Sequence, residues 1–330
     1  MTDYMSADTQ AILLLTVRLG AASHAESATP TEYNRVARAL HEAALRPASL
    51  LEASGDSGPI QVAAEVLGAE RVQALLSRSL LLATEISRWQ ALGIWVVSRA
   101  DEDYPRPLKS KMGGSSPAIF FGAGDRGVLG KPGLGVVGSR NVDQEGLDFA
   151  EELGRKTAAD GFVVVSGGAR GSDRAAMNGA IDAGGTAVGF LSDGLEKAVS
   201  SGESRTFIEA GNLTLLTHVA PSESFAVWRA MERNKFIYAQ SFASVVVESD
   251  QGKGGTWEGA KEQLKRLHFC PVYLRDSDPL SPGRAALEKL GARRLGEFSA
   301  SELERLSTAE PVAEPEDPPP SASQLTLDFF

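Results

Sequence analysis

The chain has 330 residues, of which 42% are hydrophobic, and this length and composition favour two domains. A formal net charge of −10 excludes a protein that coats DNA through a broad basic surface, so any nucleic-acid site must be local. A single cysteine, Cys270, excludes an internal disulfide, and no apolar run is long enough to cross a membrane.

The amino-terminal part of the chain shows a helical pattern. No secretory leader is recognisable there, which predicts a cytoplasmic protein without a membrane partner. Apolar residues recur at helical spacing over residues 11–92 and predict several short helices. Thr84 and Gly93 supply start and stop signals for the last helix, whereas Thr31 is a weak start signal because no Gln or Glu follows three positions later. We interpret residues 1–93 as a small helical domain.

Strand and helix patterns alternate in the rest of the chain. After Gly133, the predicted strands are separated by helices of about ten to fifteen residues, as in the βαβ units of a parallel sheet. The sequence therefore predicts an α/β domain over residues 94–307, built on a doubly wound parallel sheet. Its predicted strands comprise residues 94–98, 118–121, 134–137, 162–165, 186–191, 213–216, 244–247 and 271–274.

Three glycine-rich turns lead from predicted strands into predicted helices. Backbone N–H groups and helix dipoles converge at such junctions of a doubly wound sheet, which favours the binding of phosphate. A tight connection between strand and helix is the alternative explanation for each turn, but all three carry a basic residue. The proposed phosphate-binding residues are Gly138, Ser139 and Arg140 in the first turn, Ser166, Gly167, Gly168, Arg170 and Gly171 in the second, and Lys253, Gly254, Gly255 and Thr256 in the third.

A basic helix precedes the predicted strand at residues 244–247. It places Arg229, Arg233 and Lys235 close together, with Asn234 between two cations. A solvated basic face is one explanation. Phosphate binding is the other, and it accounts for Asn234 because an amide offers a donor and an acceptor to a base edge or a sugar. We therefore add Arg233, Asn234 and Lys235 to the proposed pocket, and we predict no cofactor and no metal because neither a dinucleotide nor a metal-ligand motif occurs.

Three motifs of the chain resemble a known family. GVVGSR, GFVVVSGGARGSDRAAMNGAIDAGG and ERNKFIYA occur in this order and are similar to the core of the DNA processing protein A family (DprA, also called Smf). The resemblance covers most of residues 8–275. It implies an extended Rossmann-like fold that binds single-stranded DNA, forms a homodimer and loads a RecA-type recombinase during DNA processing. By position, it also implies which residues line the pocket for the strand: Ser139 and Arg140, the Gly167–Gly171 loop with Arg170, and the Arg233–Asn234–Lys235 run.

Two segments depart from the pattern of that family. Residues 192–225 replace its usual cysteine–glycine and proline-rich stretch. The run GKGGTWEGA, from Gly254 to Glu258 in particular, is similar to the lysine-decarboxylase-like (LOG) phosphoribohydrolases, whose motif joins a double glycine to a threonine and a glutamate. In the DNA-binding interpretation no residue is catalytic. The alternative is a nucleoside monophosphate phosphoribohydrolase with Glu258 as acid or base and Arg233 on the phosphate, and a nucleotide-signal sensor is a further alternative.

The end of the sequence combines a linker with a short apolar motif. Residues 308–323 are rich in Pro, Glu, Ala and Ser, which predicts a disordered linker. Residues 324–330, QLTLDFF, resemble the Q-L-x-L-x-F peptide by which bacterial proteins dock on the replicative sliding clamp. A tail that folds back on its own domain, or pairs in a dimer, is the alternative. The residues that match the clamp-binding peptide are Gln324, Leu325, Leu327 and Phe329.

Overall fold

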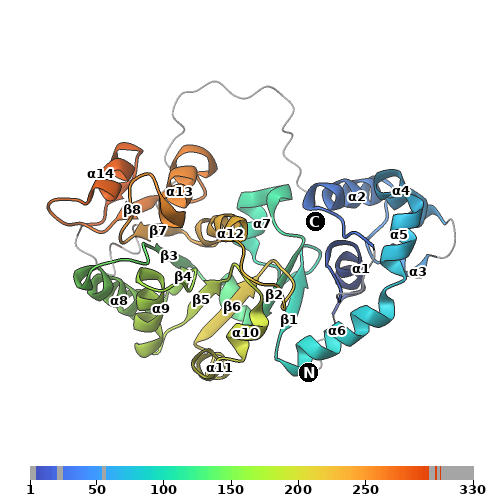
Figure 1. Ribbon diagram of the computed structural model, residues 1–330, viewed down its shortest axis with the longest axis horizontal. Helices are drawn as coiled ribbons and strands as arrows, with labels where there is room; N and C mark the ends of the chain where they lie inside the picture. Colours follow the sequence, from blue (N-terminus) through green and yellow to red (C-terminus); the bar gives the residue numbers. More distant parts are fainter. Residues whose placement is uncertain (1–4, 21–24, 54–56, 297–301, 303–304, 306–330) are drawn as a thin grey trace.

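The chain folds into amino-terminal helices followed by a large sheet flanked by helices (Figure 1). This computed structural model describes residues 5–20, 25–53, 57–296, 302 and 305. The predicted linker and clamp-binding peptide, residues 308–330, lie outside the described residues. No helix in the described part of the chain is long and apolar enough to cross a membrane. The amino-terminal helices are α1 (Ala7–Thr16), α2 (Pro30–Glu42), α3 (Ser49–Glu52), α4 (Gly58–Leu67), α5 (Ala69–Leu76) and α6 (Ser79–Ala91).

Two of these helices begin elsewhere than the sequence signals predict. Helix α2 starts with a capping box, in which the Glu32 N–H donates to the Thr29 hydroxyl and the Thr29 N–H donates to the Glu32 carboxylate over 2.8 Å. Helix α6 starts at Ser79, so the prediction that Thr84 begins it is wrong. The Thr84 hydroxyl instead donates to the Leu80 carbonyl within the helix. Gly93, with φ of 70°, follows the end of α6 as predicted.

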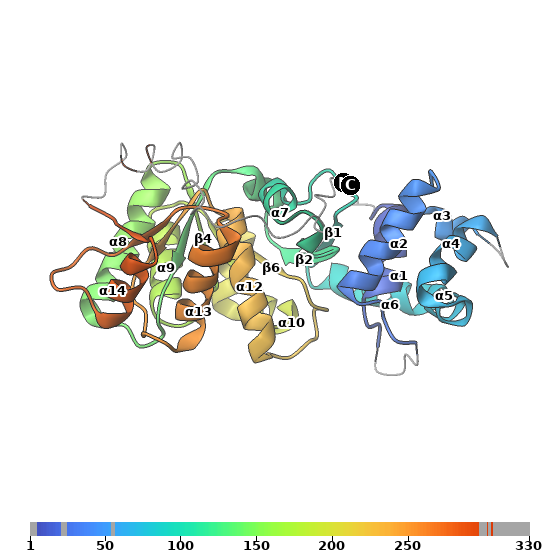
Figure 2. The ribbon, with the colours of Figure 1, turned by 90° about the horizontal axis from the view of Figure 1, so that it is seen from above.

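The described chain has a nine-stranded sheet, in the order β1-β2-β6-β5-β4-β3-β7-β8-β9. Figure 2 shows the amino-terminal helices next to the end of the sheet that carries β1 and β2. The pairs β1–β2 and β2–β6 are antiparallel, and all other pairs are parallel. The predicted α/β class with a Rossmann-like sheet is confirmed, with two antiparallel strands added at one edge. The strands are β1 (Trp95–Ser98), β2 (Ile119–Ala123), β3 (Gly133–Val137), β4 (Val163–Ser166), β5 (Ala187–Phe190), β6 (Leu213–Thr217), β7 (Ala243–Val246), β8 (Val272–Leu274) and β9 (Arg293–Arg294).

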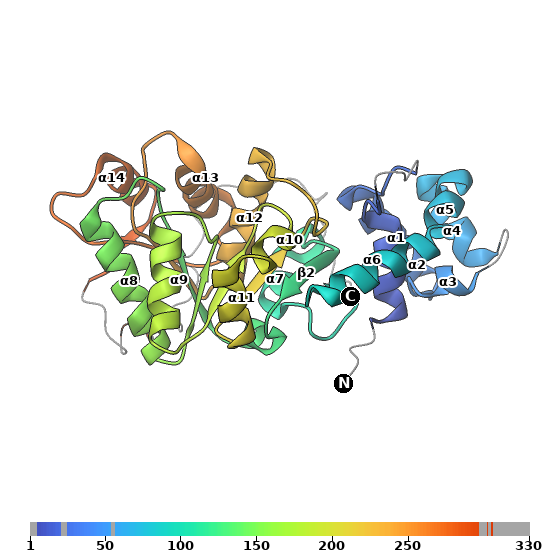
Figure 3. The same cartoon turned by 60° about the horizontal axis from the view of Figure 1, so that its bottom comes forward.

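Helices cover both faces of the sheet (Figure 3). Apolar residues of α8, α9, α10 and α11 pack in the cluster on one face, and those of α7, α12, α13 and α14 pack in the cluster on the other. The helices are α7 (Arg106–Met112), α8 (Gln144–Ala159), α9 (Ser172–Asp182), α10 (Leu195–Val199), α11 (Gly202–Glu209), α12 (Val227–Gln240), α13 (Gly254–Glu262) and α14 (Pro282–Lys289). Shorter turns are η1 (Gly113–Ser115), η2 (Arg126–Gly130) and η3 (Gln263–Leu267).

The amino-terminal helices share the hydrophobic core of one sheet face. The Trp89 ring of α6 meets the Phe121 ring of β2 edge-on, with 4.9 Å between their centroids. On the opposite face, Phe120 packs edge-on against Phe236 of α12 at 5.4 Å. Adjacent residues of β2 thus anchor the amino-terminal helices on one side and α12 on the other.

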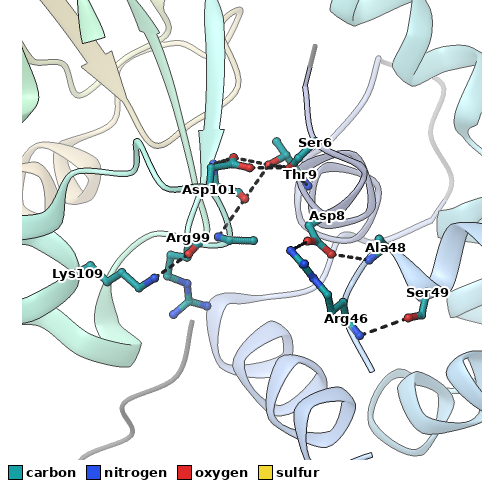
Figure 4. Close-up of polar contacts among 11 residues, drawn as sticks. Ser6, Asp8, Thr9, Arg46, Ala48, Ser49, Arg99, Asp101 and Lys109 are labelled. Atoms are coloured by element: carbon teal, nitrogen blue, oxygen red, sulfur yellow. Dashed lines mark hydrogen bonds and ion pairs between the residues drawn. The ribbon is translucent and has the colours of Figure 1, made fainter. Parts of the chain in front are cut away.

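Polar contacts also join α1 to the strand β1 (Figure 4). The Asp101 carboxylate accepts hydrogen bonds from the Ser6 hydroxyl at 2.6 Å, from the Thr9 hydroxyl, and from the Ser98 N–H at 2.8 Å. The Asp101 carboxylate, in the loop after β1, therefore binds both the start of α1 and the end of β1. Because its donors come from both parts, this carboxylate is satisfied only when the parts are packed together.

The order of the strands creates a crevice at one edge of the sheet. From β3 the chain proceeds through β4, β5 and β6 in one direction, and the later strands β7 and β8 lie on the other side of β3. Connections from β3 and β7 therefore leave on opposite sides of the sheet. Ligands of open α/β folds bind at such a switch point, outside the carboxyl ends of the strands.

Candidate functional site

A pocket of about 450 Å³ lies at this switch point. Three of the segments singled out in the sequence converge on it: the turn after β3, the middle of α12, and the loop that enters α13. The predicted residues that line it are Gly138, Ser139, Arg140, Arg233, Asn234, Lys253, Gly254, Gly255 and Thr256. Residues separated by more than a hundred positions in the sequence thus face one cavity.

Arg233 is a buried cation at this pocket. It is 7% exposed, and its partner in the described chain is Asp173, whose Oδ2 lies 3.9 Å from Arg233 Nη1. The buried Nε of Arg233 has no hydrogen-bond partner there. Burial lowers the pKa of the guanidinium, and the Asp173 charge opposes that shift. A guanidinium still stays protonated at neutral pH, so the pocket holds a positive charge with unused donors.

Asp173, at the start of α9, is a site residue that the sequence analysis missed. It is 4% exposed, and burial raises the pKa of its carboxyl group. Its two oxygens accept the N–H groups of Gly138 and Gly167, each at 3.2 Å. The expectation that these two amides are free for phosphate is therefore wrong. An acidic residue directly after a glycine-rich loop, at a helix amino end, was the signal available in the run SGGARGSD.

Other groups of the first two turns are also engaged within the protein. The Ser139 N–H donates to the Glu248 carbonyl at 2.9 Å. Ser166 is fully buried at the end of β4, and its hydroxyl donates to the Val136 carbonyl at 2.6 Å. Ser166 is therefore part of the floor below the pocket and not a ligand-facing residue. What the pocket offers a ligand is side chains more than backbone amides.

The second turn supports the pocket from below. A side chain at Gly167 would collide with the Arg233 guanidinium. At Gly171, where φ is +89°, a Cβ would lie 2.7 Å from the Ser139 carbonyl oxygen and 3.1 Å from Arg140 Cα. These glycines are required for close packing between the first two turns. Gly168 and the exposed Arg170 do not line this pocket; Gly168 lines a neighbouring cavity.

The remaining predicted residues have partners within the protein. Asn234 lines it, but its amide also donates to the Gly255 carbonyl at 2.9 Å and so ties α12 to the third turn. Lys235 Nζ lies 3.3 Å from Glu262 of α13, and the lysine does not line the pocket. Glu258, the acid or base of the phosphoribohydrolase alternative, pairs with Lys261 at 3.6 Å and is likewise absent from the pocket wall.

Large apolar side chains stand exposed at the mouth of the pocket. Phe225 and Val227 line it and are 51% and 72% exposed; Trp228, the next residue of α12, is 62% exposed but is not part of the pocket wall. We call these three residues the apolar rim. The Arg229 guanidinium lies 5.2 Å from the centre of the Trp228 ring. Trp257, the other tryptophan that flanks these segments in the sequence, is buried in the core.

Comparison with known proteins places the chain among DNA processing proteins. A family model for DNA recombination-mediator protein A matches residues 95–301. The chain is 27% identical over 223 residues to the DNA processing protein DprA of Bacillus subtilis, which covers 66% of this chain and 73% of that protein. It is 28% identical over 196 residues to the Streptococcus pneumoniae protein of the same name, with 58% and 68% covered.

Solved structures show the same fold. The X-ray structure of DprA from S. pneumoniae superposes with a TM-score of 0.65 at 20% identity, covering 84% of this chain and 93% of that one. A structure of DNA processing protein A from Helicobacter pylori, described with its unique single-stranded DNA binding mode, superposes with a TM-score of 0.53 at 20% identity, covering 65% and 94%. Because the family model spans more than half of the sequence, the chain belongs to the DNA recombination-mediator protein A family, as its motifs predicted.

Proposed function

We propose that the protein binds single-stranded DNA in the pocket at the carboxyl ends of β3 and β7. The observation that carries this proposal is Arg233, a buried guanidinium with unused donors. Arg140 and Lys253 line the same cavity, and the charge of Arg140 lowers the pKa of Arg233. Charged N–H donors of this kind bind the phosphate oxygens of a nucleic-acid backbone. The local cluster also explains how a chain with a net charge of −10 binds an anion.

The apolar rim favours a single strand over a duplex. Exposed Phe225 and Trp228 offer flat surfaces on which unpaired bases stack, whereas the bases of a duplex are already stacked on each other. The relative from H. pylori is described as binding single-stranded DNA, which supports the same ligand for this chain. Cationic side chains and exposed apolar side chains thus lie at or beside one pocket.

The experiment is a binding titration with fluorescent oligonucleotides over a range of salt concentrations. Trp228→Ala removes a stacking surface and is expected to weaken binding about tenfold. Arg140→Ala is expected to make the salt dependence shallower by about 0.7 in the logarithmic slope. Leu80→Ala, which truncates a side chain 83% exposed on the distant helix α6, is the matched control and is expected to bind as the wild type does. Binding by Trp228→Ala and Arg140→Ala that equals binding by the wild type would contradict the proposal. Tighter binding of duplex DNA than of single-stranded DNA would contradict it as well.

The phosphoribohydrolase alternative gains no support from the position of Glu258. Its carboxylate pairs with Lys261 and does not face the pocket. The purified protein is therefore expected to release no base from nucleoside monophosphates. Base release would replace the binding proposal by an enzymatic one.

We also propose that residues 324–330 recruit the protein to the replicative sliding clamp, and that the protein forms a homodimer and loads a RecA-type recombinase. These proposals rest on the sequence and on the family, since the peptide lies outside the described residues. Deletion of residues 324–330 is expected to abolish capture of the chain by immobilised clamp and to leave DNA binding unchanged. Equal capture of the truncated chain would contradict the clamp proposal.

A further inference from the structure

A second cavity, of about 340 Å³, lies beside the proposed DNA pocket. It is walled by α9, α10 and α11 and by residues of β6. Its wall includes apolar side chains, among them Met177, Leu191 and Phe207. Two of its walls, α10 and α11, come from residues 192–225, the segment that departs from the sequence pattern of the family.

Two exposed cations line this cavity without a protein partner. The side chains of Arg174 on α9 and Lys197 on α10 make no hydrogen bond or ion pair with the described part of the chain. Most exposed arginines on the neighbouring helices do have such partners, as Arg155 of α8 has in Glu151 and Glu152. Unpaired cations beside an apolar surface suit a ligand that has both a phosphate and a flat ring.

The loop of residues 167–171 connects the two cavities. Gly167 packs on Arg233 and Gly171 on the backbone of Arg140, both at the DNA pocket. Gly168 lines the second cavity, where a Cβ on it would lie 3.7 Å from Leu191 Cδ2. Arg170 of the same loop is exposed. Cationic side chains therefore lie along a path from the DNA pocket, past Arg170 on this loop, to Arg174 and Lys197 at the second cavity.

We propose that the second cavity is a further nucleotide subsite for the same DNA strand, which makes this inference dependent on the proposed function. Arg170, Arg174 and Lys197 bind phosphates of the strand as it leaves the first pocket, and a base lies on the apolar wall. Asp193 and Glu203 also line the cavity. A carboxylate there accepts a hydrogen bond from an exocyclic amino group, which cytosine has and thymine lacks, so the subsite favours cytosine over thymine.

The test compares oligo-dC and oligo-dT, from the dinucleotide upward in length. For the wild type, affinity is expected to rise with length until the second subsite is filled, and longer oligo-dC is expected to bind more tightly than oligo-dT of the same length. In Arg174→Ala/Lys197→Ala the affinity for the shortest oligonucleotides is expected to stay unchanged. The affinity for longer ones is expected to fall about tenfold, and the salt slope to become shallower by about 1.4, because each phosphate contact contributes about 0.7.

Lys131→Ala is the matched control, since Lys131 is an exposed cation that precedes β3 and so lies at the opposite end of the strands. An unchanged length dependence in the double variant, or an equal loss in Lys131→Ala, would overturn the subsite while the proposed function stands. Equal binding of oligo-dC and oligo-dT by the wild type would overturn the role of the carboxylates. Failure of the wild type to bind any oligonucleotide would instead overturn the proposed function.

Discussion

Asp173 and Arg233 are opposite charges buried at the floor of one pocket, yet they are 3.9 Å apart and not directly hydrogen-bonded. The carboxylate is occupied by the amides of Gly138 and Gly167, which hold it in place. It therefore balances the charge of Arg233 without using the donors of the guanidinium. Pairing of Arg233 with a phosphate therefore does not require a hydrogen-bonded ion pair to break first.

Asp173→Asn is expected to lower the stability of the free protein by about 3 kcal/mol, because it leaves a buried guanidinium without its counter-charge. A bound phosphate restores a negative charge beside Arg233. Single-stranded DNA is therefore expected to raise the melting temperature of the variant more than that of the wild type. Asp182→Asn, on the exposed side of the same helix, is the control. Thermal unfolding with and without an oligonucleotide measures both effects, and an equal shift in variant and wild type would contradict this role of Asp173.

At the scale of residues, the sequence predicted which side chains lie together at the pocket. It was less accurate about what each of these side chains binds. Arg140, Arg233 and Lys253 do line one pocket, since each follows or flanks a strand whose carboxyl end lies at the same edge. The sequence places Asp173 at a helix amino end after the second turn, but it does not predict the bond to the Gly138 amide, because the direction of a loop N–H depends on backbone angles that spacing does not determine. Lys235 is adjacent to Asn234 in the sequence but faces α13, because neighbouring helix positions point in different directions.

At the scale of elements, the start of α2 is held by more than its own capping box. Arg71 of α5 donates two hydrogen bonds to the Glu32 carboxylate, at 2.8 Å and 3.0 Å. The same guanidinium donates to the carbonyls of Glu26 and Ser27. One arginine thus fastens the first turn of α2 and the loop before it to a second helix.

This arrangement predicts a pH dependence of stability. The hydrogen bonds from Arg71 lower the pKa of Glu32 from 4.5 to about 2. A carboxyl group whose pKa is lower in the folded state stabilises that state above its unfolded pKa of 4.5, and this contribution is lost as the pH falls towards 2. Glu32→Gln is therefore expected to cost about 1 kcal/mol at neutral pH, a modest amount because the pair is partly exposed to solvent.

The difference between Glu32→Gln and wild type is expected to shrink as the pH is lowered below 4.5. Denaturant unfolding followed by circular dichroism measures it at each pH. Glu42→Gln, at the exposed end of the same helix, is the control and should show no such trend. A difference that does not change with pH would show that the carboxylate charge of Glu32 is unimportant.

Strands were predicted more accurately than helix starts, for a physical reason. Strand β3 was expected at residues 134–137 and begins one residue earlier, because its apolar run is buried on both faces and has clear ends. Helix α6 begins five residues before Thr84, directly after Arg78, whose buried guanidinium donates to the Leu14 and Val17 carbonyls of α1 and its cap. That start is determined by contact with another helix, which local signals such as an N-cap residue do not reveal.

At the scale of the whole molecule, the strand order is what turns separate motifs into one site. Alternating strand and helix patterns predicted a doubly wound sheet, and β3 lies at the point where the winding reverses. The first pocket could therefore be expected from the sequence. The second cavity could not, since its walls depend on how α9, α10 and α11 pack over β6.

The carboxylate of Asp101 has a further consequence for the architecture. Its donors are two hydroxyl groups beside or within α1 and one strand amide, while Trp89 packs its ring on Phe121. Cutting the chain at residue 93 would remove the Trp89 ring from the sheet and leave the Asp101 carboxyl group without its two hydroxyl donors. The leading helices share one hydrophobic cluster with the sheet, so we expect them to unfold with the α/β domain as one cooperative unit.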